Sequence, residues 1–451
     1  MNITLLARRM LVSIGVVLFS AACLPAEEAP AFQTLDIAPV WAGHPVDFCL
    51  LTHAPHQFVA FYDADRKMTV AARRLTETAW RFVRLPEKVG WDSHNSIAMA
   101  IDDTGCVHLA GNMHVHPLRY FRTREPFDIE TFERVAAMVG QEENQVTYPQ
   151  FFRGPNNEFL FTYRHGRSGS GSQIYNVYDA ETRTWRRLLD QPLVDGEGRR
   201  NAYFDGPLRG PDGFFHLCWV WRDTPDCATN NNLSYARSRD LVQWERSNGQ
   251  SLALPITLAT AEIVDPVPSG GGIINGNHKI GFDLENRVVI TYHKFDAAGN
   301  TQLFHARLEE GAWVIRQHTQ WDYRWEFQGG GTIPFEIGVS PVRVESGHLV
   351  QEWRHSRYGH QRWRIDPATL QPLERVEIPL DTLPDGFHKV SSDFPGMQVR
   401  TCGDSGQADR PDICYLLRWE TLGQNRDKPR DPPWPAPSML RLYAVPKSTP
   451  G

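Results

Sequence analysis

Residues 102–112, DDTGCVHLAGN, join a polar turn to an alternating apolar strand, and this phrase recurs along the chain. It recurs in residues 155–166 (PNNEFLFTYRHG), 211–222 (PDGFFHLCWVWR), 283–294 (DLENRVVITYHK) and 345–355 (ESGHLVQEWRH). The spacing, on the order of 50 to 70 residues, is typical of a four-stranded β-propeller blade with inserted loops. The length of the chain then predicts about seven blades, and so an all-β, seven-bladed β-propeller in a single domain.

The predicted strands end in polar side chains. These ends are Asn112-Met113-His114, Tyr163-Arg164-His165, Trp221-Arg222 and Tyr292-His293-Lys294. Because propeller strands that point the same way end on one face, distant residues could meet there in one cationic pocket that transfers protons. This layout is typical of an enzyme or of a glycan-binding protein.

Composition limits the class of protein. The 451 residues are 41% hydrophobic and 22% charged, which is ordinary for a globular chain that buries a large core. The formal net charge of -6 argues against a nucleic-acid partner, because such proteins carry a basic excess. Most of the 14 Trp residues are expected in blade cores, although aromatic rings also stack on sugars.

The N-terminal residues 1–26 are predicted to be an export signal. Arg8-Arg9 precede an apolar run, and small residues follow it before Cys23. Cys23 could also belong to a lipobox, which would tether the protein to a membrane by an N-terminal lipid. We therefore expect a periplasmic, extracellular or outer-membrane lipoprotein location, with residues 27–451 forming the propeller domain.

Seven cysteines are present, and six remain when Cys23 is set aside. Cys402 could pair with Cys414, and Cys218 with Cys227, across short polar loops. Cys49 and Cys106 lie in apolar strand contexts and are expected to be buried thiols. The pairing cannot be assigned from spacing alone.

The sequence predicts neither a catalytic zinc site nor an organic cofactor. No pair of Cys-x-x-Cys motifs and no His-Glu-x-x-His helix supports a catalytic zinc site. A structural cation, calcium or zinc, in the propeller channel stays open, and its ligands are unknown. No organic cofactor is expected.

Four residues form the strongest candidate for chemistry. His94 and His114 place two imidazoles one strand pair apart, and Tyr148 precedes Arg164 by one hairpin. An arginine binds a carboxylate bidentately, while histidine and tyrosine can move protons. Together they supply what β-elimination from a uronic acid requires, with Tyr163 and Tyr203 as alternative phenols.

The chain resembles a known family in the stretches that carry these residues. Residues 93–122, 147–171 and 200–238, together with INGNHKIGFD, TYHKFDAAGNTQLFHARL and DYRWEFQGGG, are similar to the BNR-4 family. The resemblance runs from about His94 to Leu370. This family includes propeller polysaccharide lyases that act on ulvan and on rhamnose–glucuronate linkages, and related α-L-rhamnosidases.

The resemblance implies roles for individual residues. His94 and His114 correspond to the paired histidines of the lyases, Tyr148 to the tyrosine that transfers protons, and Arg164 to the arginine that neutralises the uronate. Arg222 resembles a second anion-binding arginine. In the related rhamnosidases this set is incomplete, so the set found here favours elimination over hydrolysis.

Further substrate-binding candidates lie near predicted strand ends or loops. They are Asn95, Tyr163, His165, Tyr203, His278, His293, Lys294 and Arg324. Some have a structural alternative: Tyr163 could face the interior of a blade, and His293 could be a hydrogen-bonding residue that lines the channel.

The function predicted from the sequence is an exported lyase that cleaves a rhamnose–uronic acid linkage in an acidic, rhamnose-containing polysaccharide. The first alternative is an α-L-rhamnosidase-type hydrolase on the same fold. The second is a glycan-binding propeller without catalysis. Neither a nucleic acid nor a protein partner is implied.

Overall fold

A computed structural model describes residues 32–378, 383–406, 410 and 412–446. The chain divides into two units, residues 1–31 and residues 32–451. The predicted export signal over residues 1–26 and the lipobox residue Cys23 lie outside the described residues. In the described part, no helix is both long and apolar enough to cross a membrane.

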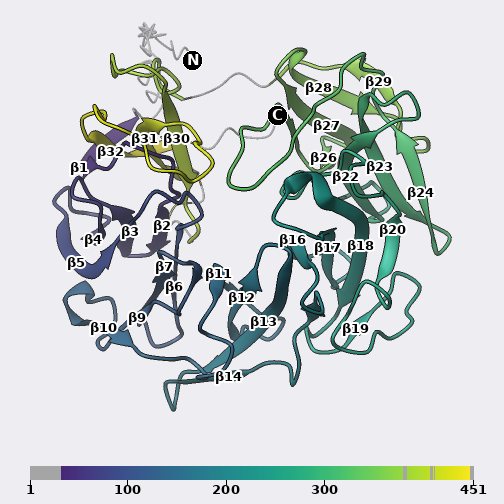
Figure 1. Cartoon of the computed structure of the whole chain (residues 1–451). Coiled ribbons are helices and arrows are strands. Elements are labelled where there is room, and N and C mark those ends of the chain that lie inside the picture. The colour runs from purple at the N-terminus through teal and green to yellow at the C-terminus, as the bar shows by residue number, and fades with distance from the viewer. Residues whose placement is uncertain (1–31, 379–382, 407–409, 411, 447–451) are drawn as a thin grey trace, which may run out of the picture. The chain divides into compact units, whose positions relative to one another are not determined.

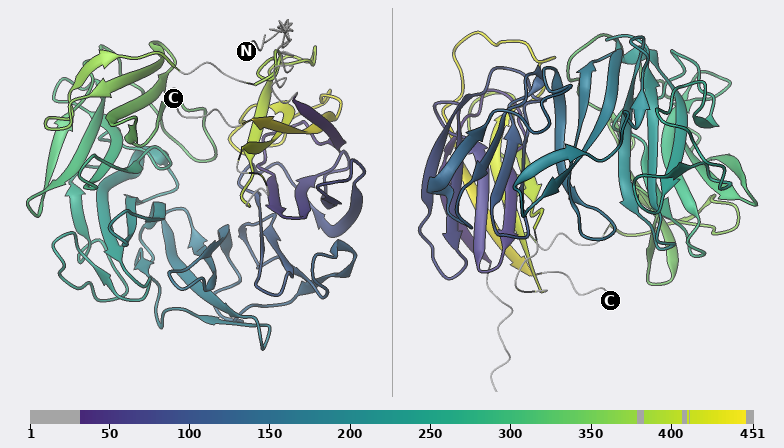
Figure 2. Two further views of the ribbon diagram at one scale, coloured as in Figure 1. Left: turned by 180° about the vertical axis from the view of Figure 1, so that it is seen from behind. Right: turned by 90° about the horizontal axis from the view of Figure 1, so that it is seen from below.

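The regular secondary structure of the described residues is almost entirely β-strand, which confirms the all-β prediction. Their strands form seven sheets, and the helical segments are two turns of 3₁₀-helix, η1 (Ile129–Thr131) and η2 (Cys227–Thr229). Figure 1 shows the sheets of this unit following one another in sequence order, and Figure 2 shows the same order from behind and from below.

Three sheets are built from the strands between residues 49 and 195. The first contains β2 (Cys49–His53), β3 (His56–Tyr62), β4 (Lys67–Arg74) and β5 (Arg81–Lys88). The second contains β6 (Ile97–Ile101), β7 (Val107–Gly111), β9 (Tyr120–Thr123) and β10 (Phe132–Val135). The third contains β8 (His114–His116), β11 (Val146–Arg153), β12 (Phe159–Arg167), β13 (Ser170–Asp179), β14 (Thr184–Arg187) and β15 (Val194–Asp195).

Four further sheets follow. The fourth contains β16 (Asn201–Arg209), β17 (Phe215–Arg222), β18 (Asn230–Ser238), β19 (Trp244–Glu245) and β20 (Glu262–Asp265). The fifth contains β21 (Lys279–Phe282), β22 (Val288–Phe295), β23 (Thr301–Glu309) and β24 (Ala312–Gln317). The sixth contains β25 (Ile337–Val339), β26 (Arg343–Glu345), β27 (His348–His355), β28 (Gly359–Ile365) and β29 (Pro372–Arg375). The seventh contains β1 (Gln33–Val40), β30 (Met397–Gly403), β31 (Ile413–Leu422) and β32 (Ser438–Pro446).

The seventh sheet joins the two ends of the described chain. β1 pairs antiparallel with β32, with Leu35 opposite Leu442. The last described strand therefore pairs with the first. Trp419 of β31 stacks on Phe48 with ring centroids 4.5 Å apart, so aromatic packing also joins the seventh sheet to the residues that lead into the first.

The repeated phrase forms the same element in five sheets, where its strands are β7, β12, β17, β22 and β27. An aspartate side chain fixes the turn before β7: Asp102 Oδ1 accepts hydrogen bonds from the backbone N–H groups of Thr104 (2.9 Å) and Cys106 (3.0 Å). Gly105 has φ of 85°, a conformation that glycine adopts without steric cost. The aspartate and the glycine of this turn therefore fix where β7 begins.

Two histidines inside these strands form hydrogen bonds within their own sheets. His108 of β7 is fully buried between Asp102 Oδ2 (3.0 Å) and the Tyr120 hydroxyl (2.6 Å). His216 of β17 repeats the arrangement with Asp212 (2.9 Å) and Tyr235 (2.6 Å). Burial lowers the pKa of both imidazoles, so they are neutral hydrogen-bonding residues of the protein interior.

The two local disulfides considered from the sequence do not form. Cys218 and Cys227 are buried free thiols, and Cys402 is also a free thiol. Cys402 Sγ instead lies 3.3 Å from the carbonyl oxygen of Phe48. Cys49 and Cys106 are buried free thiols, as expected.

Candidate active site

Strand β11 lies between two strands that carry predicted catalytic residues. Its residue Thr147 lies opposite His114 of β8 on one side and Arg164 of β12 on the other. The ladder between β11 and β12 shifts register between Thr147 and Gln150, and Tyr148 lies in this irregularity. The bulge therefore changes the direction of the Tyr148 side chain, whose ring lies beside the Arg164 guanidinium.

Two residues with a strained backbone conformation lie at the same place. Tyr148 has φ of 57°, and Val115, next to His114, has φ of 59°. Bulky and β-branched residues rarely adopt this left-handed conformation, which costs on the order of 1–3 kcal/mol at each position. Such strain persists where surrounding structure imposes it, and it commonly marks functional sites.

His94 and His114 are held by one carboxylate. Asp92 Oδ1 lies 2.8 Å from His94 Nδ1, and Asp92 Oδ2 lies 2.5 Å from His114 Nδ1. The two imidazole rings stack with centroids 4.2 Å apart. Because the carboxylate engages both Nδ1 atoms, it fixes both ring orientations and leaves the two Nε2 atoms for other partners.

A second carboxylate reaches this cluster from the far end of the sequence. Asp427 Oδ2 lies 3.4 Å from His94 Nδ1, and Asp427 Oδ1 accepts a hydrogen bond from the Ser93 backbone N–H at 3.0 Å. Asp427 also accepts from the Thr332 backbone N–H at 2.7 Å. The loop that carries His94 is therefore held to two distant loops.

Charge and hydrogen bonding control the state of Asp92. Burial alone would raise the pKa of its carboxyl, but the hydrogen bonds and charges of His114 and His94 outweigh burial and hold the pKa well below its usual range. Asp92 is therefore an anion at neutral pH.

The candidate tyrosines and arginines lie next to the histidine pair. The Tyr148 ring lies 5.9 Å from the His94 ring, and the Arg164 guanidinium lies 5.0 Å from the centre of the Tyr148 ring. Tyr203 lies 6.2 Å from Tyr148, ring to ring. Arg222 Nη1 donates to the Tyr203 hydroxyl at 3.4 Å. The sequence prediction that these residues meet therefore agrees with the geometry.

Arg164 retains unused hydrogen-bond donors. Its side chain is buried, and Nη2 donates to Thr147 Oγ1 at 3.1 Å. Among the described residues, Nε and Nη1 of Arg164 have no hydrogen-bond partner. Arg222 differs, because its Nε and Nη2 donate to the backbone carbonyls of Thr224 and Pro225. Arg164 is therefore the better placed of the two to bind an additional anion.

The two tyrosines have opposite pKa shifts. Burial raises the pKa of Tyr148, helped by the neighbouring Tyr203, and outweighs the opposing effect of Arg164. Burial also acts to raise the pKa of Tyr203, but there the charges of Arg164 and Arg222 win, and the net pKa is lowered. Tyr148 thus holds its proton more firmly than Tyr203.

A cavity of about 240 Å³ opens beside this cluster. Tyr148, Arg164 and Tyr203 contribute to its lining. The lining also includes Gln150 and Gln173, which the sequence did not single out. The cavity therefore brings uncharged hydrogen-bonding groups next to an arginine with free donors, an arrangement suited to an anionic sugar.

The other predicted binding residues lie apart from this cluster or have partners of their own. Tyr163 packs in a hydrophobic core, where its hydroxyl accepts a hydrogen bond from Arg187 at 3.1 Å. His165 Nε2 lies 2.9 Å from Asn144 Oδ1. Asn95 is buried, and its backbone carbonyl accepts from the Tyr62 hydroxyl at 2.6 Å.

The fifth-sheet candidates have a different environment. His278 and His293 are fully buried, and burial lowers the pKa of each imidazole to about 4. Lys294 Nζ pairs with Asp265 Oδ2 at 2.5 Å. Arg324, just beyond this sheet, donates to the Gly299 carbonyl at 2.7 Å and covers the Phe295 ring. None of these four contacts the histidine pair through an interaction found among the described residues.

The histidine pair also has the donor set of a metal site. Ligand atoms of Asp92, His94 and His114 lie within 4.8 Å of one another. Two imidazoles and a carboxylate suit a divalent cation such as zinc. Such an ion would compete for the Nδ1 atoms that hydrogen-bond to Asp92, so proton transfer and metal binding are alternative uses of this cluster.

Sequence reasoning missed Asp92 and Asp427. Asp92 lies two residues before His94, and an acidic residue so close to a candidate histidine was an available signal. Asp427 lies in a polar, Pro-rich stretch that carries no such signal.

Fold and site together define an all-β protein of repeated antiparallel sheets, with a cluster of two histidines, tyrosines and arginines. The chain belongs to the BNR_4 family of BNR repeat-containing proteins, whose family model matches residues 56–321. The resemblance identified in the sequence is thereby confirmed.

Relatives of known activity are similar to parts of the chain or to its fold. The "Ulvan lyase, long isoform" of Pseudoalteromonas sp. (strain PLSV) is 25% identical over an alignment that covers 26% of this chain and 17% of that protein. The crystal structure of polysaccharide lyase Uly1 matches with a TM-score of 0.60 at 13% identity, covering 92% of this chain and 99% of that one.

A PL25 ulvan lyase bound to -[GlcA(1-4)Rha3S]- matches with a TM-score of 0.58 at 13% identity. The match covers 92% of this chain and 96% of that one. At such identities the similarity shows that the fold is shared.

Proposed function

We propose that this protein is a polysaccharide lyase that cleaves a rhamnose–uronic acid linkage in an acidic polysaccharide by β-elimination. In this proposal the seven sheets are the blades of a β-propeller, and residues 27–451 form one catalytic domain. Support comes from membership of the BNR_4 family, from the ulvan lyase relative and from the fold shared with polysaccharide lyases.

The observation that carries the proposal is the state of Arg164. A buried guanidinium, two of whose nitrogen atoms have no hydrogen-bond partner among the described residues, lines a cavity beside Tyr148 and close to the histidine pair. A uronate carboxylate would accept charge-assisted hydrogen bonds from these donors. Neutralising that carboxylate acidifies the C5 proton, which is the first requirement of β-elimination.

The proton steps follow from the protonation states. The raised pKa of Tyr148 keeps its phenol protonated, so Tyr148 suits the acid. Asp92 occupies both Nδ1 atoms, so Nε2 of His94 or His114 is available as the base. The base takes the C5 proton, the C4–C5 double bond forms, the C4–O bond breaks, and the acid protonates the departing oxygen.

Tyr203 is the alternative base. Its lowered pKa makes the phenolate more accessible than that of Tyr148, and it lies within the same cavity. In either version the side chains carry both proton transfers, and the proposed reaction needs no organic cofactor.

The proposed substrate is an acidic, rhamnose-containing polysaccharide of the ulvan type or with rhamnose–glucuronate ends. The related solved structure holds -[GlcA(1-4)Rha3S]-, and the curated relative is an ulvan lyase. We further propose that the protein is exported through residues 1–26, with a lipid tether if Cys23 is the processed residue.

A hydrolase would ordinarily use a pair of free carboxylates. The acidic residues in nearby loops and strands are engaged: Asp205 pairs with Lys279 at 3.1 Å, and Asp265 pairs with Lys294. This observation favours elimination over α-L-rhamnosidase chemistry.

The test follows the ultraviolet absorbance of a conjugated uronate while purified protein is mixed with ulvan or with a rhamnose–glucuronate-capped arabinogalactan. A rise with either polymer is expected. Free rhamnose without a rise would replace the lyase with a hydrolase, and saturable binding without any product would replace it with a glycan-binding protein.

A further inference from the structure

A larger cavity, of about 640 Å³, lies where the fifth and sixth sheets meet. Its lining comes from the end of β24, the segment after it, β27, β28 and the start of β29. These elements are separate from the strands that carry the histidine pair, Tyr148 and Arg164. The volume falls within the range of small-molecule sites, roughly 300–1,000 Å³.

Aromatic rings dominate the apolar part of the lining, which includes Trp321, Trp353, Tyr358 and Trp363. The Trp321 and Tyr358 rings lie nearly parallel, at 17° with centroids 5.9 Å apart. Trp353 meets Trp321 edge to face at 5.1 Å. Flat rings of this kind stack against the apolar faces of pyranose sugars.

The polar part of the lining is uncharged. Gln317, Gln361 and Gln371 contribute amide groups, and no Asp, Glu, Lys or Arg among the described residues lines the cavity. His318 also lines it, and burial lowers the pKa of its imidazole to about 4, so it is neutral at neutral pH. Amides donate and accept hydrogen bonds, which matches the hydroxyl groups of a neutral sugar.

Two buried polar atoms of the lining residues have no partner. Trp353 Nε1 and His318 Nδ1 are both buried, and neither has a hydrogen-bond partner among the described residues. Leaving a buried polar group unpaired costs about 1–3 kcal/mol. A ligand that carries several hydroxyl groups could remove that cost.

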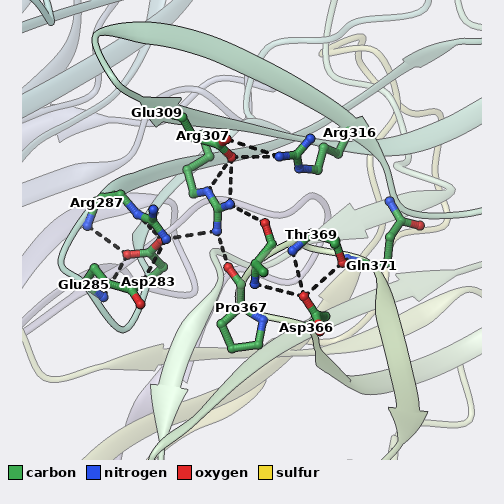
Figure 3. A network of polar contacts seen from close by, with 11 residues as sticks. Asp283, Glu285, Arg287, Arg307, Glu309, Arg316, Asp366, Pro367, Thr369 and Gln371 are labelled. Atoms are coloured by element: carbon green, nitrogen blue, oxygen red, sulfur yellow. Dashed lines mark hydrogen bonds and ion pairs between the residues drawn. The ribbon is translucent and has the colours of Figure 1, made fainter.

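A polar network, drawn in Figure 3, includes the cavity-lining residue Gln371. Arg307 of β23 donates to the carbonyls of Pro367 and Ala368, in the turn that follows β28. At the end of that turn, Gln371 Nε2 donates to the Gln317 carbonyl at 2.9 Å. The fifth and sixth sheets are thereby fixed to each other beside the cavity, which pre-organises it.

We propose that this cavity binds an uncharged pyranose residue of a glycan, at a site separate from the candidate active site. Aromatic rings would stack on the sugar, and the glutamine amides and the Trp353 indole would bond its hydroxyl groups. Because the described residues that line the cavity include no cationic side chain, it discriminates against uronates. The site would hold a polysaccharide on the protein independently of cleavage.

The test uses Arg164→Ala protein, in which the proposed carboxylate site is disabled. Methyl α-L-rhamnopyranoside and methyl β-D-xylopyranoside are the uncharged probes, and methyl β-D-glucuronide is the charged comparator. Saturation-transfer NMR detects binding, and chemical-shift titration measures affinity. We expect binding of at least one uncharged probe and at least tenfold weaker binding of the glucuronide.

Two substitutions and a control assign the site. Trp363→Ala and Gln361→Ala should each weaken binding of the uncharged probe at least tenfold, whereas Phe82→Ala, at an exposed ring on β5, should not. Thermal unfolding checks that each variant is folded. If Trp363→Ala does not fold, Gln361→Ala alone assigns the site. Absence of binding by both uncharged probes, equal binding of the glucuronide, or unchanged affinity in folded variants would overturn the proposal. A protein that cleaves no polymer would leave this result unaffected.

Discussion

The imidazole rings of His94 and His114 stack 4.2 Å apart, although one lies in a loop before β6 and the other begins β8 of a different sheet. Their common partner is Asp92, which lies close to both Nδ1 atoms. One carboxylate therefore sets the orientation of both rings. This dependence makes Asp92 a positioning residue for the proposed chemistry.

Asp92→Asn should lower turnover by roughly 10²- to 10⁴-fold, the range expected when general acid–base chemistry is disrupted. An asparagine amide presents an N–H to one of the two Nδ1–H groups, so at least one ring must change its tautomer or turn. Initial rates of uronate formation as a function of pH measure the effect. The pH profile should change shape, and Asp103→Asn, at an exposed position, should behave like the wild type. Near-native turnover of Asp92→Asn would remove the positioning role.

Arg164→Ala should reduce turnover by about 10²- to 10³-fold, the size of effect seen when one electrostatic stabiliser is removed. Arg164→Lys keeps the charge but loses the bidentate geometry, so it should recover only part of the activity. Arg167→Ala, on the same strand and exposed, is the matched control. If all three variants cleaved equally well, the carboxylate would have to bind elsewhere.

Tyr148→Phe and Tyr203→Phe distinguish the two phenols. If Tyr148 is the acid, Tyr148→Phe should cut kcat by roughly 10²- to 10⁴-fold. Tyr203→Phe should then act mainly on KM, because Tyr203 would contact substrate without transferring a proton. Steady-state kinetics on one polymer measure both constants. A large loss of kcat only in Tyr203→Phe would assign the proton transfer to Tyr203.

Much of the fold follows from local sequence. The turn and strand phrase identified β7, β12, β17, β22 and β27, because its turns rely on aspartate, asparagine or glycine at fixed positions. The equivalent strands β3 and β31 were not found as repeats. The turn before β3 contains Ala54-Pro55, which departs from that pattern.

The candidate site was predictable only in part. His94, His114, Tyr148 and Arg164 were chosen by residue type and by their place near strand ends, and the structure brings them together. Asp427 is brought to His94 by tertiary folding across more than 300 positions, and no local pattern encodes that contact. Tyr163 shows the converse: it adjoins Arg164, but alternation along β12 turns it into the core.

Chelation tests the two alternative uses of the histidine cluster. We expect protein treated with EDTA to retain its lyase activity, because the proposed proton transfers use side chains alone. Added Zn²⁺ should inhibit by occupying Asp92, His94 and His114. Zinc binding, measured by calorimetry, should weaken in Asp92→Asn. Loss of activity on chelation, restored by Zn²⁺, would instead make the cluster a catalytic metal site.

Acid should destabilise the protein before its carboxylates titrate. Burial lowers the pKa of His293 and His318 to about 4 in the folded state, from 6.5. As pH falls below about 6.5 the unfolded chain binds protons that the folded chain does not, so stability declines until about pH 4. Each such histidine contributes a slope of up to about 1.4 kcal/mol per pH unit.

Asp102 extends this acid sensitivity to lower pH. Burial acts to raise its pKa, but hydrogen bonds from His108 and Thr104 prevail and lower it to about 2, so its stabilising effect is lost as pH falls from about 4 to 2. Thermal unfolding from pH 8 to about pH 2 measures both phases. His318→Gln should make the decline between pH 6.5 and 4 shallower, since glutamine takes up no proton. A constant unfolding temperature over that interval would contradict the burial of neutral histidines.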